Sequence, residues 1–359
     1  MTRFAEHRRV FFVEEPVFEA IPAPRMDVSR RSDTVVVVVP SLPWGTSPEE
    51  AIPIQKAMLE ELFEIYSVER PTFWYYTAMA MAFTSDFDAH RVVYDCMDEL
   101  AAFKGAPPEH LAYERDLISR ADHVFTGGHS LYEAKKALHP SVHPFPSSID
   151  VDHFRAAREA LPVPADERGI PGPRVGFYGV IDERADLDLI AGIARLRRDW
   201  QLIMIGPVVK IDPDLLPRAD NIHYLGMKSY KDLPAHLANW DLAIMPFALN
   251  ESTQFISPTK TPEYLAAGKP VVSTPIRDVV QPYGQEGLVR IAATPEEFVR
   301  EAERAMHERK TDRDWLDRVD AFLSQSSWDL TWGRMAELEM LGAIEDVSHR
   351  VLSTPSGAS

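Results

Sequence analysis

The sequence predicts an α/β protein with two doubly wound parallel sheets that face each other across a cleft. Short apolar runs of strand length alternate with helical patterns along most of the chain, as they do in strand–helix–strand units. The runs are continuous rather than alternating in polarity, which is typical of strands buried on both faces of a parallel sheet. A chain of 359 residues also exceeds what one compact core usually holds. We therefore expect two domains.

The first half alternates expected strands and helices. The strands are β-branched and aromatic runs at 9–13, 34–39, 72–76, 91–94 and 123–126. The helices between them carry apolar residues at helical spacing and cover 49–68, 111–120 and 130–138. Ser130 and Glu133 have the spacing of a capping box, so the last of these helices is predicted to begin at Ser130.

The second half repeats this alternation more clearly. Its expected strands are 174–180, 201–205, 221–225, 241–247, 269–273 and 288–291, and its expected helices are 187–197, 231–240, 262–267 and 295–307. A stretch rich in Pro and Gly at 160–172 lacks periodicity and is typical of a linker. We therefore place domains at 1–160 and 161–326. The remaining residues, 327–359, are expected to hold a helix at 328–344 that crosses back to the first domain.

Composition excludes several functional classes. The chain has 38 Lys and Arg against 55 Asp and Glu, a formal charge of −17, which argues against nucleic acid as a partner because such binding needs a basic face. The single cysteine, Cys96, excludes an internal disulfide and a four-cysteine zinc site. No apolar run reaches the ~18 residues of a membrane span, and no secretory signal is recognisable. These features predict a cytoplasmic protein.

The strongest local signal is the segment 257–273, SPTKTPEYLAAGKPVVS. Thr261 and Pro262 are typical of a helix cap and first helical residue, and Glu263 lies in the first turn. A polar loop that leads into a helix N-terminus and carries Lys260 is suited to a diphosphate. Glu263 could then accept the hydroxyls of a ribose. In the alternative interpretation, Glu263 only complements the helix dipole and Lys260 is a solvated surface charge.

This segment also carries a family resemblance. PEYLAAGKPVVS at 262–273, DLAIMPF at 241–247, DVDHF at 150–154, VVYDCMDEL at 92–100 and GVIDER at 179–184 together resemble retaining GT-B glycosyltransferases of group 1 (family 4), in a bacterial subgroup. The resemblance implies two Rossmann-like domains, with a nucleotide-sugar donor on the C-terminal one. A saccharide or lipid-linked acceptor would lie on the N-terminal one.

The resemblance also implies a reaction and a setting. The reaction is transfer of a hexose-like sugar with retention, in bacterial cell-surface polysaccharide or glycolipid synthesis. The nucleotide sugar is a co-substrate, and neither a cofactor nor a metal is expected. Peripheral contact with the inner face of the membrane is a further expectation, for which the arginines near the start of the chain are a weak hint: Arg3, Arg8, Arg9, Arg25, Arg30 and Arg31.

On the donor side, the resemblance carries over unevenly. Glu263 matches the glutamate that holds the ribose. The residues expected to meet the sugar and phosphates are Ser257, Thr259, Lys260, Thr261, Gly179 and Arg184. Val180 stands where the family has a phosphate-binding arginine, and Phe255 stands where it has another glutamate. Glu251 lies near that position but out of register, and it is kept as a candidate contact to the donor sugar.

On the acceptor side, the candidates follow the strands of the first half. Asp98 or Glu99 is expected to orient or activate the acceptor hydroxyl, because a carboxylate can take its proton. His129 is a candidate hydrogen-bond donor to the substrate. Asp95 is expected to face the cleft on the acceptor side, and Trp44 with Gly45 could stack on a sugar ring there. The plainer alternatives are helix-capping carboxylates, a structural histidine and a buried tryptophan in a turn.

The beginning of the chain departs from the family pattern. Related sequences have a further strand before the position of Met1, so the first strand of the N-terminal domain is expected to be missing. Either translation starts upstream of Met1 or the protein lacks that strand.

Two other functions stay open. Val180, Phe255 and the missing strand are compatible with a binding scaffold that has lost catalysis, and a nucleotide-sugar epimerase uses the same fold. The chain has no GxGxxG, GxxxxGK[ST] or GxSxG motif, which argues against dinucleotide oxidoreductases, P-loop proteins and serine hydrolases.

Overall fold

The C-terminal half is built on a six-stranded parallel sheet with the order β11-β10-β9-β12-β13-β14. Its strands are β9 (Arg174–Tyr178), β10 (Gln201–Ile205), β11 (Ile222–Gly226), β12 (Leu242–Met245), β13 (Val271–Ser273) and β14 (Arg290–Ile291). The central strands are buried along nearly their whole length, as their continuous apolar runs predict. The strand order reverses between β9 and β12, which is where doubly wound sheets bind ligands.

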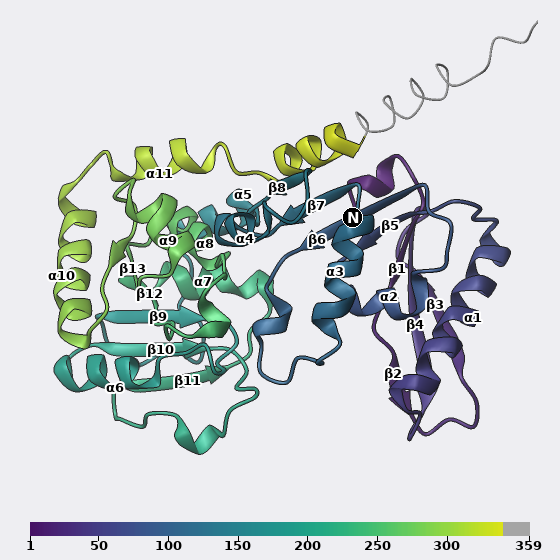
Figure 1. Ribbon diagram of the computed structural model, residues 1–359. Coiled ribbons are helices and arrows are strands. Elements are labelled where there is room, and N and C mark those ends of the chain that lie inside the picture. The colour runs from purple at the N-terminus through teal and green to yellow at the C-terminus, as the bar shows by residue number, and fades with distance from the viewer. Residues whose placement is uncertain (340–359) are drawn as a thin grey trace, which may run out of the picture.

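Helices cover both faces of this sheet (Figure 1). They are α6 (Leu187–Leu196), α7 (Leu233–Ala238), α8 (Lys260–Ala266), α9 (Arg277–Val279), α10 (Pro295–Thr311) and α11 (Trp315–Leu323). Asp186 caps α6 by accepting from the backbone N–H of Leu189 at 2.8 Å. A Cβ atom on Gly192 would lie within 3.0 Å of Pro295, so this glycine allows α6 and α10 to pack closely.

The N-terminal half contains two separate sheets rather than one. In the first, β4 (Val35–Pro43) pairs in parallel with β1 (Val10–Val13) and then with β2 (Val17–Glu19) along one edge, and β3 (Arg25–Arg30) pairs antiparallel with its other edge. The second has the parallel order β5 (Thr72–Tyr75), β6 (Arg91–Cys96), β7 (His123–Thr126) and β8 (Val142–Pro144). Within residues 1–339, the part of the chain that the computed structural model describes, β1 pairs only with β4 and β5 only with β6.

Within residues 1–339, no strand of one sheet pairs with a strand of the other. Side chains still bridge the two sheets: Phe12 and Tyr76 have ring centroids 6.4 Å apart. The ring centroid of Phe63, in the helix α1 (Pro48–Tyr66), is 6.2 Å from that of Phe73 in β5.

The helices of the N-terminal half are α1 (Pro48–Tyr66), α2 (Met81–Thr84), α3 (His110–Arg120), α4 (His129–Lys135) and α5 (Val151–Arg155). Ser47 and Glu50 form a reciprocal capping box at the start of α1. The predicted start of α4 at Ser130 is wrong, because the helix begins at His129 and Ser130 lies inside it. Ser130 hydrogen-bonds instead to Asp278 of the other half. Its predicted capping partner, Glu133, is paired with Lys136.

The chain crosses between the halves twice. Ile149, Phe154 and Ala157 belong to the core of the C-terminal half, so the packing boundary lies before the linker at 160–172. Residues 328–339 are helical and lie against the N-terminal half, where Met335 and Leu338 pack on Val93, Phe125 and Phe145; this group is a separate small core. The rest of the expected crossing helix, 340–344, lies outside the described residues.

Ion pairs fix the start of the chain to this last helix. Arg8 pairs with Glu339 at 2.6 Å, and Arg3 pairs with Asp329 at 2.5 Å. Arg25 pairs with Asp27 and Glu19. Half of the arginines that hinted at membrane contact are thus already paired within the chain. Within residues 1–339, every helix is too short or too polar to cross a bilayer.

Candidate functional site

The candidate site lies after β9, where the strand order reverses. Gly179 follows β9 with a φ of +147°, and Gly206 follows β10 with a φ of +138°. A Cβ atom on Gly206 would lie within 3.0 Å of the carbonyl oxygen of Gly179, and the N–H of Gly179 donates to the oxygen of Ile205 at 2.9 Å. The two loops therefore pack backbone against backbone, which only glycine permits here.

Lys260 lies directly over this glycine turn. A Cβ atom on Gly179 would come within 3.0 Å of Lys260 Cε. Burial lowers the pKa of Lys260, and the nearby charge of Glu263 opposes this shift. Neither a hydrogen bond nor an ion pair from its ammonium group occurs within residues 1–339. A half-buried ammonium group without a protein partner is suited to an anionic ligand.

Arg184 supplies a second positive charge to the same place. It pairs with the buried Asp182 at 2.7 Å, and this hydrogen bond raises the pKa of Arg184. Arg184 is close enough to Lys260 to lower the pKa of that lysine further. Two cations whose charges act on each other in a partly desolvated place favour a ligand with more than one negative charge.

Glu263 lies one turn into α8. Its Oε2 accepts from the hydroxyl of Tyr178 at 2.6 Å, and the N–H of Tyr178 donates to the hydroxyl of Tyr264 at 3.0 Å. Burial raises the pKa of Glu263, while Tyr178 and then Lys260 oppose this. The carboxylate is thus fixed in place by β9 and keeps Oε1 available to a hydroxyl donor.

The loop before α8 differs from the prediction in one respect. The helix begins at Lys260, and Thr259 precedes it without a side-chain capping bond. Thr261 is fully buried, and its hydroxyl is directed at Met245 Sδ at 3.3 Å. The prediction that Thr261 caps the helix is therefore wrong: the side chain lies in the core. Ser257 and Thr259 remain partly exposed in the loop.

Asp98 of the N-terminal half lies near enough to these cations for their charges to act on it. Burial raises its pKa, and the charges of Arg184 and Lys260 lower it. Sequence reasoning placed Asp98 on the acceptor side and the two cations on the donor side. The structure brings all three together.

Glu99 lies in a buried network instead. It pairs with Lys135 at 2.9 Å, and Lys135 also pairs with Glu114 at 2.8 Å. Glu114 in turn accepts from the hydroxyl of Tyr94 at 2.7 Å. This network connects α3, α4 and β6 inside the N-terminal half, so Glu99 stabilises the packing of that half.

Asp95 lies within β6 rather than after it. It is 4% exposed, and its Oδ2 accepts from Trp74 Nε1 at 3.0 Å. Its Oδ1 is buried and has no hydrogen-bond partner among the described residues. Burial raises the pKa of Asp95 to about 6, against smaller opposing effects of Trp74 and the Met1 amino group. The structure thus places Asp95 in the packing of the sheet.

We expect the Asp95→Asn variant to be more stable than the wild type at neutral pH. The raised pKa means that the folded state binds the proton more tightly than the unfolded chain. In the wild type, the protonated Asp95 carboxyl stabilises the fold fully below pH ~4, and this contribution is lost as the pH rises through about 6. The free energy of unfolding of Asp95→Asn should therefore exceed that of the wild type by about 3 kcal/mol at pH 7.5 and equal it near pH 4. Urea unfolding at both values measures it, and an equal effect at both pH values would contradict the assignment.

The remaining predicted residues are exposed on the surface: His129, Glu251, Trp44 and Gly45. His129 is the exposed first residue of α4. Glu251 is exposed, and its neighbour Ser252 donates to the carbonyl of Ala102 in the other half at 3.2 Å. Trp44 is 71% exposed, and its Nε1 donates to Phe18 at 3.0 Å. Trp44 and Gly45 follow β4, in a different sheet from Asp98 and His129.

Sequence reasoning missed Phe103. This residue of the N-terminal half lies with its ring 5.6 Å from the guanidinium of Arg184 and 5.4 Å from the ammonium of Lys210. It brings an aromatic face to the cations of the C-terminal half. No local signal could identify it, because both partners are far away in the sequence. Asp182 was also missed, although its spacing from Arg184 was a local clue.

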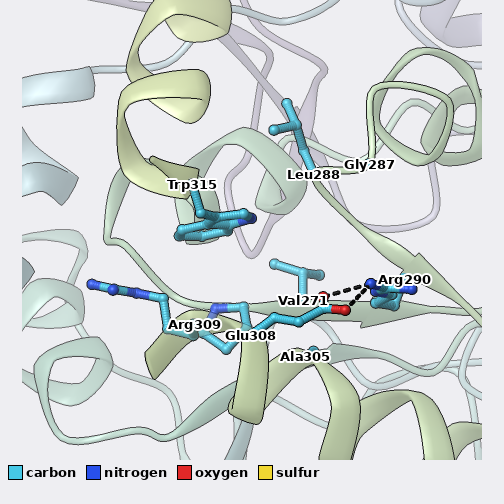
Figure 2. Close-up of a pocket in the computed structure, with 9 residues that line it drawn as sticks. Val271, Gly287, Leu288, Arg290, Ala305, Glu308, Arg309 and Trp315 are labelled. Atoms are coloured by element: carbon cyan, nitrogen blue, oxygen red, sulfur yellow. Dashed lines mark hydrogen bonds and ion pairs between the residues drawn. The ribbon is translucent and has the colours of Figure 1, made fainter. Parts of the chain in front are cut away.

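A small hollow elsewhere in the C-terminal half is a poor candidate. It is lined by Val271, Leu288, Arg290, Arg309 and Trp315 among others, near the amino end of β13 (Figure 2). Glu308 and Arg290 form an ion pair across it. Its volume of about 20 Å³ holds little more than a water molecule. It also lies at the opposite end of the sheet from Gly179.

No metal centre was found in the described part of the chain. Within residues 1–339, His, Cys, Asp and Glu side chains do not gather in threes as a metal ion would require. The expectation that activity needs no metal remains a prediction.

Part of the C-terminal half matches a known protein family. Residues 172–308 match the family "Glycosyl transferases group 1". A curated relative from Bacillus subtilis (strain 168), named "Putative teichuronic acid biosynthesis glycosyltransferase TuaH", is 29% identical over 222 residues. The match covers 57% of this chain and 56% of the relative. The chain therefore spans about half the length of the curated relative that it matches.

Several solved structures have the same fold. Sucrose-phosphate synthase from Thermosynechococcus elongatus superposes with a TM-score of 0.67 at 15% identity, covering 95% of this chain and 91% of that one. Anabaena Alr3699/HepE in complex with UDP gives 0.61 at 15% identity, with 85% and 86% covered. An α,α-trehalose-phosphate synthase (UDP-forming) from Burkholderia xenovorans, in complex with glucose-6-phosphate, gives 0.65 at 11% identity, with 93% of each covered. The chain has the GT-B fold, and the family match supports a glycosyltransferase.

Proposed function

We propose that the protein transfers a sugar from a nucleoside diphosphate sugar to a saccharide or lipid-linked acceptor, with retention at the anomeric carbon. One observation carries this proposal: Lys260 lies over Gly179 beside Arg184, so two cations from different loops meet where the strand order reverses. A nucleoside diphosphate fits such a place, because its diphosphate needs two positive groups and its ribose needs an acceptor such as Glu263.

The reaction needs little more from the protein than charge and position. As the bond between the sugar and the diphosphate breaks, its electron pair stays on the phosphate oxygen, and Lys260 and Arg184 stabilise the growing negative charge. The acceptor oxygen bonds to the anomeric carbon on the same face, and its proton passes to the leaving phosphate. Asp98 orients the acceptor hydroxyl in this scheme, and no protein nucleophile is required.

A second candidate function follows from Phe255. This residue stands where the resemblance predicts a glutamate, and it packs against the core of the N-terminal half around Tyr94 and Leu131. A side chain committed to that packing cannot contact a sugar hydroxyl. A scaffold that binds the nucleotide sugar without transferring it is therefore the alternative.

The cellular role is proposed from the relative. Its name connects it with teichuronic acid biosynthesis, which supports a role in cell-surface polysaccharide synthesis. A lipid-linked acceptor would bring the protein to the inner face of the membrane.

Thermal shift with UDP, GDP, ADP and dTDP tests the proposal. A nucleotide at a hundred times its dissociation constant should stabilise the protein by about 2.7 kcal/mol, which corresponds to several degrees. The nucleotide that stabilises the protein identifies the nucleoside diphosphate of the donor, and the corresponding nucleotide sugars are then used in an assay of sugar transfer. Transfer to an acceptor supports the proposed enzyme, and binding without consumption of the donor supports the scaffold. Consumption without an acceptor would indicate an epimerase.

We expect the Glu263→Ala variant to bind this nucleoside diphosphate about ten-fold more weakly, the cost of a hydrogen bond to a charged group. Glu286, exposed in the same half, gives the matched control, Glu286→Ala. Calorimetric titration measures both. Equal affinity of the two variants would remove Glu263 from the site.

A further inference from the structure

The two halves touch at the start of α4. Asp278 of α9 belongs to the C-terminal half and is 5% exposed. Its Oδ1 accepts from the backbone N–H of Ser130 at 2.9 Å and also from the Ser130 hydroxyl. Ser130 lies in the first turn of α4, where backbone N–H groups have no partner within the helix. A carboxylate from one half therefore completes a helix of the other.

Gly128 makes this contact possible. A Cβ atom on Gly128 would lie within 3.0 Å of Asp278 Oδ2 and also of Ser257 Cβ. Any larger residue at position 128 would push the halves apart. Ser257 belongs to the loop that leads to Lys260, so the N-terminal half rests on the loop that the proposed function assigns to the donor.

The contact is built from buried, directional groups. Oδ2 of Asp278 is buried without a hydrogen-bond partner in the described part of the chain. Burying a carboxylate oxygen without a hydrogen bond costs free energy. The backbone N–H and the hydroxyl of Ser130 fix the orientation of this carboxylate. The neighbouring contacts between the halves are less buried: Ser252 with Ala102, and Phe103 with Arg184. Asp278 is thus the anchor of this part of the interface.

We infer that Asp278 is a positioning residue that fixes the alignment of the two halves for transfer. Through Ser130 it sets the distance from His129 and Asp98 to Lys260 and Arg184. This inference rests on the proposed function, because alignment matters to a reaction whose donor lies on one half and whose acceptor lies on the other. Asp278 touches neither substrate in this account.

The test compares graded variants of this contact. In Asp278→Ala we expect kcat for transfer to fall at least ten-fold and the acceptor KM to rise, while the dissociation constant of the nucleoside diphosphate changes less than two-fold. Asp278→Asn keeps an acceptor oxygen for Ser130 and should retain at least a third of the wild-type kcat. Adding Ser130→Ala to Asp278→Ala should cause little further loss, because both variants remove the same contact.

The control is Asp312→Ala. This variant breaks an exposed ion pair with Arg318, 2.7 Å long, in the same half, and should leave kcat, KM and nucleotide affinity unchanged. Wild-type kcat and KM in Asp278→Ala would overturn the inference. A nucleotide affinity that falls together with kcat would also overturn it, because the effect would then be local damage to the donor loop.

A distance measurement tests the same inference without catalysis. Spin labels on cysteines placed at Glu109 and Asp214, exposed positions in opposite halves, report the separation of the halves. We expect a broader distance distribution in Asp278→Ala than in the wild type or Asp312→Ala, and identical distributions would overturn the inference. If the wild type binds no nucleotide, the proposed function fails, and this measurement still decides whether Asp278 aligns the halves.

Discussion

Replacing Lys260 with alanine is expected to weaken the binding of a nucleoside diphosphate by about 10- to 100-fold. The estimate follows from a hydrogen bond between charged groups, worth about 1.5–3 kcal/mol. Lys260 supports a large value because its side chain is partly desolvated over Gly179 and has no ion-pair partner in the described part of the chain. Its charge is therefore available to the ligand at no cost to another interaction.

The comparison with the monophosphate makes this prediction specific. If Lys260 contacts the distal phosphate, the nucleoside monophosphate should lose less than about three-fold in the same variant. Lys231, an exposed lysine of the same half, provides the control Lys231→Ala, which should bind both nucleotides as the wild type does. Equal losses for mono- and diphosphate would contradict a role for Lys260 at the diphosphate.

Replacing Gly206 with alanine is expected to have the largest effect on stability. The added Cβ would lie within 3.0 Å of the Gly179 carbonyl oxygen, a backbone atom that cannot rotate away, and the φ of +138° disfavours any other residue. Crowding and backbone strain together should lower the free energy of unfolding by about 3 kcal/mol or more. The Gly179 turn should also shift, so nucleotide binding should be lost.

Gly226 offers a matched control for this variant. It also has a positive φ, +67°, but a Cβ atom there would meet no atom within 4 Å. Gly226→Ala should therefore show only the cost of backbone strain, about 1 kcal/mol. Chemical unfolding of both variants separates the two effects. A loss in Gly206→Ala no greater than that in Gly226→Ala would show that the two loops are not packed as described.

Much of the fold could be predicted because its strands are deeply buried. The runs at β9, β10 and β12 are apolar without interruption, and the structure buries them on both faces. The strands β2 and β3 were missed because their side chains are mostly exposed, and β8 was missed because only Val142 of its three residues is buried. Such short or exposed segments leave no hydrophobic pattern to read.

Helix starts were misplaced where a polar residue has a distant partner. Ser130 and Thr261 both look like caps in the sequence. One binds Asp278 across the interface and the other is buried beside Met245. The same limit applies to the candidate site: Lys260 and Glu263 were predicted from a local motif, and Arg184 from the family resemblance. The position of Phe103 against Arg184 depends on how the halves meet, which no local pattern encodes.

The carboxylates of the first half show why roles were harder to predict than locations. The sequence placed Asp95, Asp98 and Glu99 together after a strand. The structure separates them by what surrounds each: Asp95 lies against Trp74, Glu99 is paired with Lys135, and Asp98 lies near the cations. A shift of one or three residues along the chain changes the surroundings of a side chain completely.

Hydrogen exchange with and without a saturating nucleoside diphosphate would locate the donor site on the chain. Slower exchange is expected in peptides that cover 178–184 and 256–264, because the nucleotide would contact the Gly179 turn and the loop before α8. Peptides from β4 and the start of α1, near Trp44, should be unchanged. Protection confined to the N-terminal half, or protection that leaves 178–184 and 256–264 unchanged, would contradict a donor site at Lys260.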